Sequence, residues 1–402
     1  MSNKTINFSI ALIARNEENN MIELGENLKK YIDIGLEVIL IDTGSTDKTV
    51  EIAKKNDFNV YIPDNLNELN CKLQNYEIEF INNNVIVKEE LESLQNCGID
   101  YTKYFNFSLA RNIIQKVNTK NDMILFIDAS DRIVNMNYDI INKLLSDGMQ
   151  RFEYYLYAGH EKLKISRFYN KRIEEWECRV HEVLSVKTNR ENIILLNESI
   201  LKVQHFYKNK TRNYLGGLLI DYINNMKNTR YIYYLGREFF FLRMYRSSMK
   251  ILKQYLDLDI KEGWLAERSS ASIIIGECYF NLNDFKNANK YFMNAFDISQ
   301  GWREPLIKAA RLCQKTDEFR KGIALAHASL GLESIDGFSE DTRNYTVVPF
   351  EILYWGYYWT GKKEIAKKYW KLCLDIEPNN SKYNEDAKFF KDIKDIDEVK
   401  VL

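Results

Sequence analysis

The sequence has 402 residues, of which 45% are hydrophobic and 28% charged, and its formal net charge at pH 7 is −1. This composition is ordinary for a globular protein and supplies enough apolar residues for two or three domains with large cores. Because the net charge is close to zero, no global field attracts nucleic acid or anionic lipid, and we expect neither as a partner.

The start of the sequence and its cysteines indicate a compartment. Residues 1–20 lack the basic segment, apolar segment and cleavage site of a secretory signal, and the sequence has no run of about 18 apolar residues. We therefore expect a cytoplasmic protein without a membrane span. The cysteines show no CxxC or other metal-binding spacing, so we expect reduced core thiols at Cys71, Cys97, Cys178, Cys278, Cys313 and Cys373.

The first 62 residues predict a strand, helix, strand, helix, strand order. Apolar runs at residues 8–14, 37–41 and 59–62 are typical of strands, and residues 21–34 and 47–56 have helical periodicity. This order indicates a parallel, doubly wound sheet. The carboxyl ends of its strands would open on one edge, where such sheets bind ligands.

Polar sequences follow the first two strands. The sequence RNEE occupies residues 15–18, and DTGSTD occupies residues 42–47, where Gly44 permits a tight turn. The Asp42 carboxylate can accept hydrogen bonds from a base or a ribose, and Arg15 can pair with phosphate or orient the loop. Capping of the next helix explains Asp42 almost as well.

The stretch NDMILFIDASDRIV at residues 121–134 is the centre of the predicted site. Its five apolar residues, 123–127, predict a strand buried on both faces of a mostly parallel sheet. Asp128 and Asp131 follow at the strand end, and their oxygens suit a hard cation such as Mg²⁺ or Mn²⁺, which in turn suits a diphosphate. A turn or helix cap rich in Asp and Ser is the alternative.

Residues 64–104 interrupt this pattern and predict an insertion. An alternating piece near residues 76–87 is typical of a hairpin, and residues 88–96 predict an acidic helix. The sequence does not distinguish a lid over the sheet from an inert excursion.

Further strands and two histidines follow the acidic centre. Residues 152–157 and 199–204 predict strands, the second of which ends at His205. His181 and Glu182 are adjacent, so they would face opposite ways in a strand but can reach one cavity from a loop.

Five motifs in order resemble the GT-A glycosyltransferases of the inverting family 2, over roughly residues 6–207. They are IARNEE at 13–18, DTGSTDKT at 42–49, FSLARN at 107–112, FIDASD at 126–131 and VHE at 180–182. Two features depart from the family pattern. Ser130 stands where the family usually has a second Asp of its DxD metal motif, and the insertion at 64–104 is unusual.

The resemblance implies roles for particular residues. Glu182 would be the acidic base and His181 a second catalytic residue or an alternative metal ligand. A Mn²⁺ or Mg²⁺ ion would be held by Asp128, Asp131 and His205. The nucleotide-sugar donor, expected to be a UDP-sugar, would be bound by Ala14, Arg15, Asn16, Glu17, Asp42, Gly44, Ser45, Arg111, Asp128 and Ala129.

Helical periodicity replaces the strand signals from residue 231 onward. Small and aromatic residues recur at the positions of a tetratricopeptide repeat in four copies. The small positions Ser248, Ala288, Gly322 and Ala366 are spaced by 40, 34 and 44 residues, and loop insertions such as 334–345 would account for the longer steps. Stacked helix pairs form a concave surface that often holds peptides, although the array can instead form a homodimer.

These patterns together predict a fold class, three segments and an activity. The fold is an α/β GT-A (Rossmann-like), mostly parallel sheet domain at 1–207, a linker or docking segment at 208–230, and an all-α tetratricopeptide-repeat domain at 231–402. The predicted protein is a metal-dependent inverting glycosyltransferase that acts on a peptide or protein side chain and is similar to the peptide (bacteriocin) S-glycosyltransferases. The alternatives are a surface-polysaccharide transferase, a non-catalytic repeat adaptor with a relic GT-A domain, and a nucleotidyl transferase.

Overall fold

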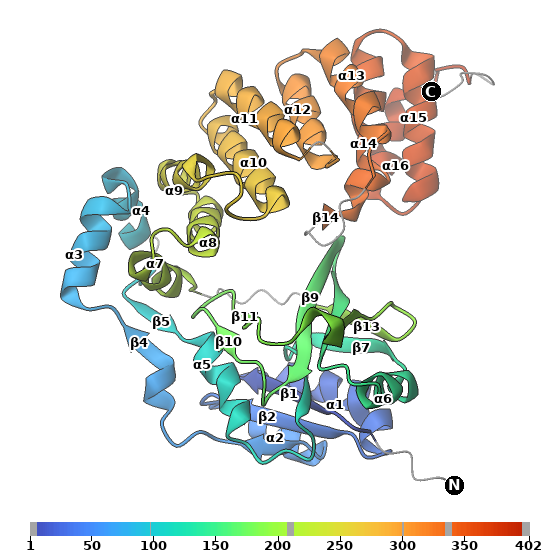
Figure 1. Ribbon diagram of the computed structural model, residues 1–402. Coiled ribbons are helices and arrows are strands. Elements are labelled where there is room, and N and C mark those ends of the chain that lie inside the picture. The colour runs from blue at the N-terminus through green and yellow to red at the C-terminus, as the bar shows by residue number, and fades with distance from the viewer. Residues whose placement is uncertain (1–5, 97, 207–212, 300, 334–339, 396–402) are drawn as a thin grey trace. The chain divides into compact units, whose positions relative to one another are not determined.

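The computed structural model of the protein describes residues 6–96, 98–206, 213–299, 301–333 and 340–395. They form two compact units, which are coloured along the chain in Figure 1. The first unit contains the described residues up to Asn84 and Leu91–Asn225, and the second contains Val85–Glu90 and the described residues from Met226 onward. Cys97, the predicted boundary at 207 and the first six residues of the predicted loop 334–345 lie outside the described residues.

The first unit is built on a mixed sheet whose central strands run in the order β3, β2, β1, β6, β9, β8, β13 and β7. Strands β3, β2, β1 and β6 are parallel, and β9 is antiparallel to both β6 and β8. The strands of this sheet are β1 (Ser9–Ala14), β2 (Glu37–Asp42), β3 (Asn59–Tyr61), β6 (Met123–Phe126), β7 (Asp131–Met136), β8 (Arg151–Ala158), β9 (Glu161–Asn170), β12 (Ile193–Leu195), which pairs with β8, and β13 (Leu201–His205). The predicted parallel start of the sheet is confirmed.

Side chains alternate between two apolar cores on the two faces of this sheet. On one face, Ile10 of β1 and Leu125 of β6 belong to a core that also contains Leu24 of α1 (Glu18–Ile32). On the other face, Ala11 and Phe126 belong to a core that contains Trp176. Because successive strand residues point to opposite faces, a continuous apolar run is the pattern of a strand covered on both sides.

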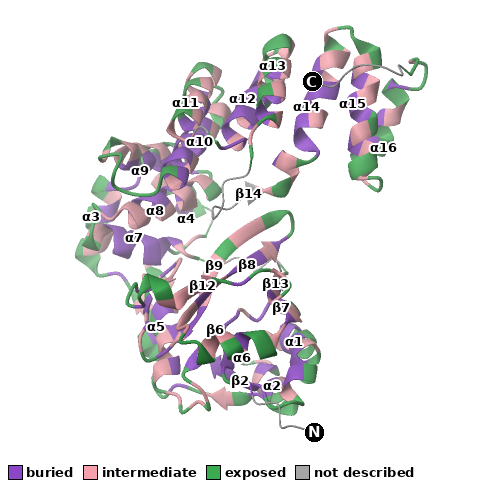
Figure 2. Ribbon diagram, turned by 45° about the vertical axis from the view of Figure 1, so that its right-hand side comes forward, coloured by how far each residue is buried: buried purple, intermediate pink, exposed green. Residues whose placement is uncertain are grey.

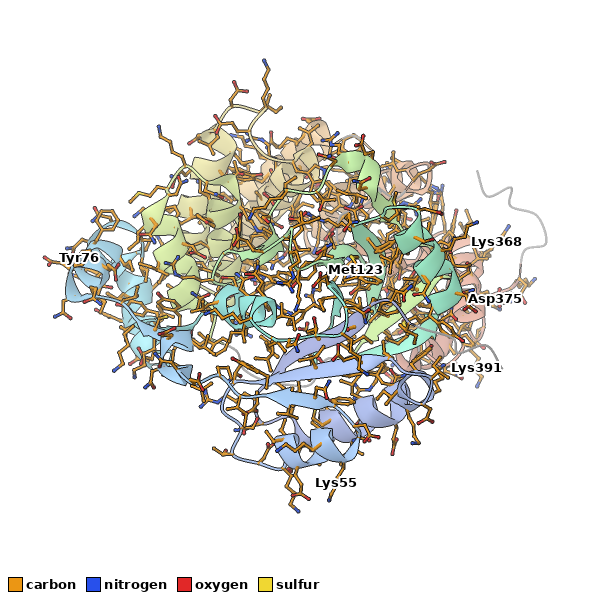
Figure 3. All side chains as sticks on the ribbon, turned by 60° about the horizontal axis from the view of Figure 1, so that its bottom comes forward. Lys55, Tyr76, Met123, Lys368, Asp375 and Lys391 are labelled. Carbon is orange, nitrogen blue, oxygen red and sulfur yellow. The ribbon has the colours of Figure 1, made fainter. Side chains whose placement is uncertain are left out.

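The predicted helices at 21–34 and 47–56 are confirmed as α1 and α2 (Thr49–Lys55). The first unit also contains α5 (Phe107–Asn112) and α6 (Tyr138–Ser146). Figure 3 shows Met123, at the start of β6, within the unit, whereas Lys55 at the end of α2 projects outward. No helix among the described residues is both long and apolar enough to cross a membrane.

The insertion is partly helical where the sequence predicts strands. The predicted hairpin at 76–87 is wrong, because α3 (Asn75–Asn84) occupies most of it, whereas the predicted acidic helix is confirmed as α4 (Lys88–Asn96). Ile81 is the buried residue of α3, whereas Phe80 beside it is exposed, so the helix covers one side of this segment and the alternation near Phe80 does not mark a strand. The insertion ends in a small antiparallel pair, β4 (Asn70–Lys72) with β5 (Lys103–Phe105).

A further helix, α7 (Leu215–Asn224), lies in the segment predicted as a linker. It groups with the first unit, contacts α3 and β5, and is buried along most of its length (Figure 2). Gly216 is needed there, because a Cβ atom at this position would lie 2.5 Å from the backbone oxygen of Tyr101.

The second unit consists of paired helices. The pairs are α8 (Thr229–Phe241) with α9 (Tyr245–Asp257), α10 (Leu265–Asn281) with α11 (Phe285–Ile298), α12 (Glu304–Lys315) with α13 (Phe319–Leu330), and α14 (Val348–Trp359) with α15 (Lys363–Ile376), followed by α16 (Ser381–Asp386). The turn within each pair has a residue of positive φ, namely Arg243, Asn283, Asp317 and Gly361. These turns are spaced by 40, 34 and 44 residues, the same steps as the predicted small positions, so the helical-repeat fold is confirmed.

Small residues sit where the paired helices cross. A Cβ atom on Gly236 would lie 2.4 Å from Leu252, and one on Gly276 would lie 2.6 Å from Phe292. The described cysteines are free thiols, of which Cys278, Cys313 and Cys373 are buried in this unit, while Cys71 and Cys178 are partly exposed.

Candidate active site

The carboxyl ends of three parallel strands meet at one edge of the sheet. Ala14 at the end of β1 pairs with Asp42 at the end of β2, and the Ile127 amide after β6 donates to the Ala11 carbonyl of β1 at 2.9 Å. The predicted polar strand ends are therefore brought to the same edge by the parallel register.

The loops after β1 and β2 hold each other through hydrogen bonds. The Asp42 carboxylate, which is buried, accepts from the amides of Gly44 at 3.2 Å and Ser45 at 3.1 Å. Asn16 has a positive φ of 56°, and its side-chain oxygen accepts from the Thr46 amide at 2.7 Å. Both loops are thus fixed by their own polar groups, and a ligand would meet a preformed edge rather than two free segments.

The remaining residues of this edge differ in exposure. Arg15 is exposed, whereas the Glu17 amide donates to the Thr49 hydroxyl at 2.7 Å, which joins the β1 loop to the start of α2. The structure therefore groups Ala14, Arg15, Asn16 and Glu17 with Asp42, Gly44 and Ser45, as the sequence predicts for one end of a nucleotide site.

A second group of polar residues lies after β6. Asp128, Asp131 and His205 each offer a ligand atom within 4.8 Å of the others, and no other group of three or more His, Cys, Asp or Glu residues does so in the described chain. His205 pairs with Asp131 across the β13–β7 register, with Nδ1 2.6 Å from Oδ1. Two carboxylates and an imidazole fit a hard divalent cation, so the residues present are compatible with the predicted metal.

Ser130 lies beside this cluster rather than away from it. Its hydroxyl oxygen is 3.5 Å from Nδ1 of His205, and the other oxygen of Asp131 accepts from the Asp128 amide at 2.8 Å. Asp131 is fully buried. Asp131, the next residue, thus provides a carboxylate that faces His205.

Arg111 of α5 joins two predicted functional carboxylates. Its Nε donates to Glu182 at 2.5 Å, and its Nη2 donates to Asp128 at 3.0 Å. The guanidinium packs against the edge-to-face pair of Phe126 and Trp176, with its central carbon 4.7 and 5.0 Å from their ring centroids. Burial alone would lower the pKa of Arg111, but the charges of Glu182 and Asp128 raise it above its ordinary value. Arg111 is consequently a fixed cation between the two acids.

Arg167 of β9 is a site residue that the sequence does not assign. Its Nη1 donates to the second oxygen of Asp128 at 2.8 Å. Burial opposes ionisation, yet Asp128 and Asp131 raise the pKa of Arg167 above its ordinary value. The signal that the sequence offers for Arg167 is its position directly before two aromatic residues, Phe168 and Tyr169, which are buried in the structure. That β9 lies beside β6 does not follow from chain order.

His181 and Glu182 lie in the loop between β10 (Trp176–Glu177) and β11 (Val183–Leu184), and they diverge. Glu182 meets Arg111, whereas the His181 ring packs 5.4 Å from the ring of Tyr214, and His181 has a positive φ of 51°. His181 is not one of the three residues in the described cluster of Asp128, Asp131 and His205.

Comparisons with known proteins give one family match. A model described as "Glycosyl transferase family 2" matches residues 9–67, and a search of curated proteins finds no match. Among solved structures, "Crystal structure of MamA" is 17% identical, with 42% of this chain and 92% of that chain covered and a TM-score of 0.35.

Two further solved structures show similar values. "Functional Characterization of Pseudomonas Aeruginosa pilF" is 13% identical, covering 43% of this chain and 72% of that chain, with a TM-score of 0.34. "Crystal structure of YrrB: a TPR protein with an unusual peptide-binding site" is 15% identical, covering 43% and 82% respectively, with a TM-score of 0.33. The segment from β1 to the loop after β3, which contains Asp42, is thus the part of this chain that is similar to glycosyl transferase family 2.

Proposed function

We propose that the protein is a metal-dependent inverting glycosyltransferase that moves a sugar from a nucleotide sugar, expected to be UDP-linked, to a peptide or protein side chain. The observation that carries the proposal is the convergence at one sheet edge of the Asp42 loop with the cluster of Asp128, Asp131 and His205. The family 2 match to residues 9–67 supports the same assignment.

The two groups of residues suit the two ends of a donor. The preformed loops around Asp42 and Asn16 offer oxygen acceptors and an exposed arginine to the nucleoside, as Arg15 lies beside them. Asp128, Asp131 and His205 would hold the Mn²⁺ or Mg²⁺ ion, which when bound stabilises negative charge on the leaving diphosphate.

Glu182 is the proposed general base. Its Oε1 is held by Nε of Arg111, which orients the carboxylate and leaves the other oxygen to accept the proton of the acceptor. The deprotonated acceptor atom would then attack the anomeric carbon from the face opposite the diphosphate, whose bond to that carbon breaks, and this in-line displacement inverts the anomeric centre. A thiol acceptor ionises more readily than a hydroxyl, so it would depend less on Glu182.

The acceptor is proposed from the second unit. Its paired helices are an architecture that often holds peptides, and the joining of a catalytic half to a repeat half resembles the peptide S-glycosyltransferases that modify bacteriocin precursors. A surface polysaccharide is the alternative acceptor, and a homodimer through the helical unit is the rival use of that surface. The cytoplasmic location remains a prediction from the sequence.

A non-catalytic adaptor is the second candidate, because both oxygens of Asp128 are paired with arginines and Ser130 replaces an acid. Incubation of the full chain with UDP-glucose or UDP-GlcNAc and Mn²⁺ separates the two candidates. The enzyme releases UDP, and Asp128→Ala abolishes this release while Asp122→Ala, at an exposed ion pair with Arg172, retains it. Absence of nucleotide binding in calorimetry would favour the adaptor, and release of pyrophosphate instead of UDP would indicate nucleotidyl transfer.

A further inference from the structure

We propose that Arg167, with Tyr154 on the neighbouring strand β8, forms the anion-binding subsite that receives the diphosphate of the donor, and that Arg167 exchanges Asp128 for phosphate when the donor binds. The inference rests on the proposed function, because it names the part of the donor that this side of the site would recognise. The glycosyltransferase resemblance assigned neither residue a role.

The first observation is an imbalance of hydrogen-bond donors and acceptors. Asp128 accepts from Arg111 and Arg167, one guanidinium at each oxygen, and both oxygens of Asp131 also have donors. In contrast, Nη1 of Arg111 and the hydroxyl of Tyr154 are buried polar atoms with no partner among the described residues. Buried unpaired donors are rare and destabilising. These two buried donors therefore lack acceptors, which an oxygen-rich anion would supply.

The position of Tyr154 ties it to this cluster. Tyr154 points inward in the strict burial alternation of β8 and is fully buried. Burial raises the pKa of its phenol above the ordinary value, and the charges of Arg167, Asp131, Asp128 and Arg111 all act on it. The phenol hydroxyl is thus a buried donor without an acceptor among the described residues, on the strand that pairs with β9.

The charges of the cluster make the binding of the cation and the binding of the diphosphate depend on each other. Two arginines and three carboxylates, those of Asp128, Asp131 and Glu182, sum to one negative charge when His205 is left out of the count. A divalent cation changes this sum to one positive charge, which attracts a diphosphate. The cation and the diphosphate therefore favour each other, and the cation competes with Arg167 for the carboxylate of Asp128.

Arg167 is better suited than Arg111 to change partners. The Arg111 side chain is 5% exposed and packs against two aromatic rings, whereas the Arg167 side chain is 24% exposed and meets Asp128 through Nη1. A guanidinium has five N–H donors in a planar fork that matches phosphate oxygens, so Arg167 can contact phosphate with its remaining donors. Displacement of Arg167 also frees one oxygen of Asp128 for the cation.

Calorimetric titration of the full-length chain tests the subsite, with UDP, uridine and inorganic pyrophosphate as probes at a fixed Mg²⁺ concentration. We expect Arg167→Gln to weaken UDP and pyrophosphate by about tenfold or more, because it removes a charge-assisted hydrogen bond, and to leave uridine unchanged. Arg167→Lys should recover part of the affinity. Arg172→Gln, which removes an exposed guanidinium paired with Asp122, is the matched control and should change none of the three.

Tyr154→Phe gives an independent readout. Because the hydroxyl is unpaired in the ligand-free protein, its removal should leave the melting temperature equal or higher, while UDP and pyrophosphate bind several-fold more weakly. If the hydroxyl has only a structural role, Tyr154→Phe binds UDP and pyrophosphate with unchanged affinity, and that result overturns this part of the proposal.

The outcomes separate this inference from the proposed function. If the unmodified protein binds UDP and Arg167→Gln binds it equally well, or loses UDP and uridine by the same factor, the subsite is wrong while the glycosyltransferase proposal stands. If UDP and uridine fail to bind but pyrophosphate binds and requires Arg167, the subsite stands and the nucleotide-sugar proposal is wrong. Failure of all three probes overturns both.

Discussion

The backbone amide of Arg179 and its guanidinium both donate to the Asp221 carboxylate, the amide at 2.9 Å. Asp221 lies in α7 and is 2% exposed, and burial raises the pKa of its carboxyl although Arg179 opposes that shift. The Arg179 carbonyl accepts in turn from the Phe107 amide at the start of α5, at 2.9 Å. The loop that leads to Glu182 is consequently fixed between α5 and α7.

Loss of this support should reduce turnover without removing the donor site. Asp221→Ala leaves the amide and guanidinium of Arg179 without their acceptor, so we expect a loss of about 1–3 kcal/mol in the free energy of unfolding. The turnover number should fall because Glu182 is less well placed, while the Kd for UDP stays within about twofold. Urea denaturation and calorimetry measure the two effects. A parallel loss of UDP binding would instead show that α7 supports the whole unit.

Arg111 should contribute strongly to stability. Arg111→Met leaves Asp128 with one cationic partner and Glu182 without its arginine, so we expect a loss of about 3–5 kcal/mol in the free energy of unfolding. Arg172→Met breaks the exposed pair with Asp122 and should cost less than about 1 kcal/mol. Urea denaturation of both variants provides the comparison, and equal losses would contradict the buried role of Arg111.

Glu182→Gln tests the base. Glutamine keeps an oxygen for Arg111 but does not accept a proton, so the turnover number on a hydroxyl acceptor should fall by about 10²–10⁴. The Kd for the donor should stay nearly constant, and a thiol acceptor should be less affected. Glu175→Gln, which alters an exposed pair with Lys187, serves as the control. Unchanged turnover in Glu182→Gln would reject the role.

Glu238 in α8 should make stability depend on pH. Burial raises the pKa of Glu238 from 4.5 to about 7, against the opposing charge of Arg237. The folded state therefore holds a proton that the unfolded state has lost, so stability falls as the pH rises from about 4.5 to about 7. Glu238→Gln removes this dependence. The free energy of unfolding of Glu238→Gln should equal that of the unmodified protein at pH 4.5 and exceed it by at most about 3 kcal/mol above pH 7, measured by thermal unfolding. A constant difference across this range would contradict the prediction.

Because α7 packs closely against the segment that leads into β5, we expect the protein's stability to be sensitive to substitution of Gly216. The Cβ atom of Gly216→Ala would meet two backbone oxygens, those of Tyr101 at 2.5 Å and Lys103 at 2.8 Å, which do not rotate away. We expect a destabilisation of about 1–3 kcal/mol or more. Gly331→Ala meets its nearest atom at 3.8 Å and should be close to neutral. Similar melting temperatures for the two variants would show that α7 shifts easily.

Local sequence is sufficient to predict the loop around Asp42 and insufficient to predict the residues that surround Asp128. Asp42 and Gly44 are found from the chain because a parallel β–α–β order places their loop at the sheet edge. Arg167 and Tyr154 come from strands that enter the sheet out of chain order, so no local pattern places them beside Asp128. The hairpin prediction failed for a related reason, because alternation around Phe80 does not reveal which side of a helix is covered.

The path of the chain determines whether the two units can be separated by cleavage or truncation. The Val87 amide donates to the hydroxyl of Ser247, and the Glu90 carboxylate accepts from the amides of Arg246 and Ser247 at the start of α9, so this short segment completes the helical unit. The chain passes from one unit to the other more than once. Neither a single proteolytic nick nor a simple truncation therefore separates the two intact, and a ribosome-bound chain has to wait some 157 residues for the partner of Glu90 to be synthesised.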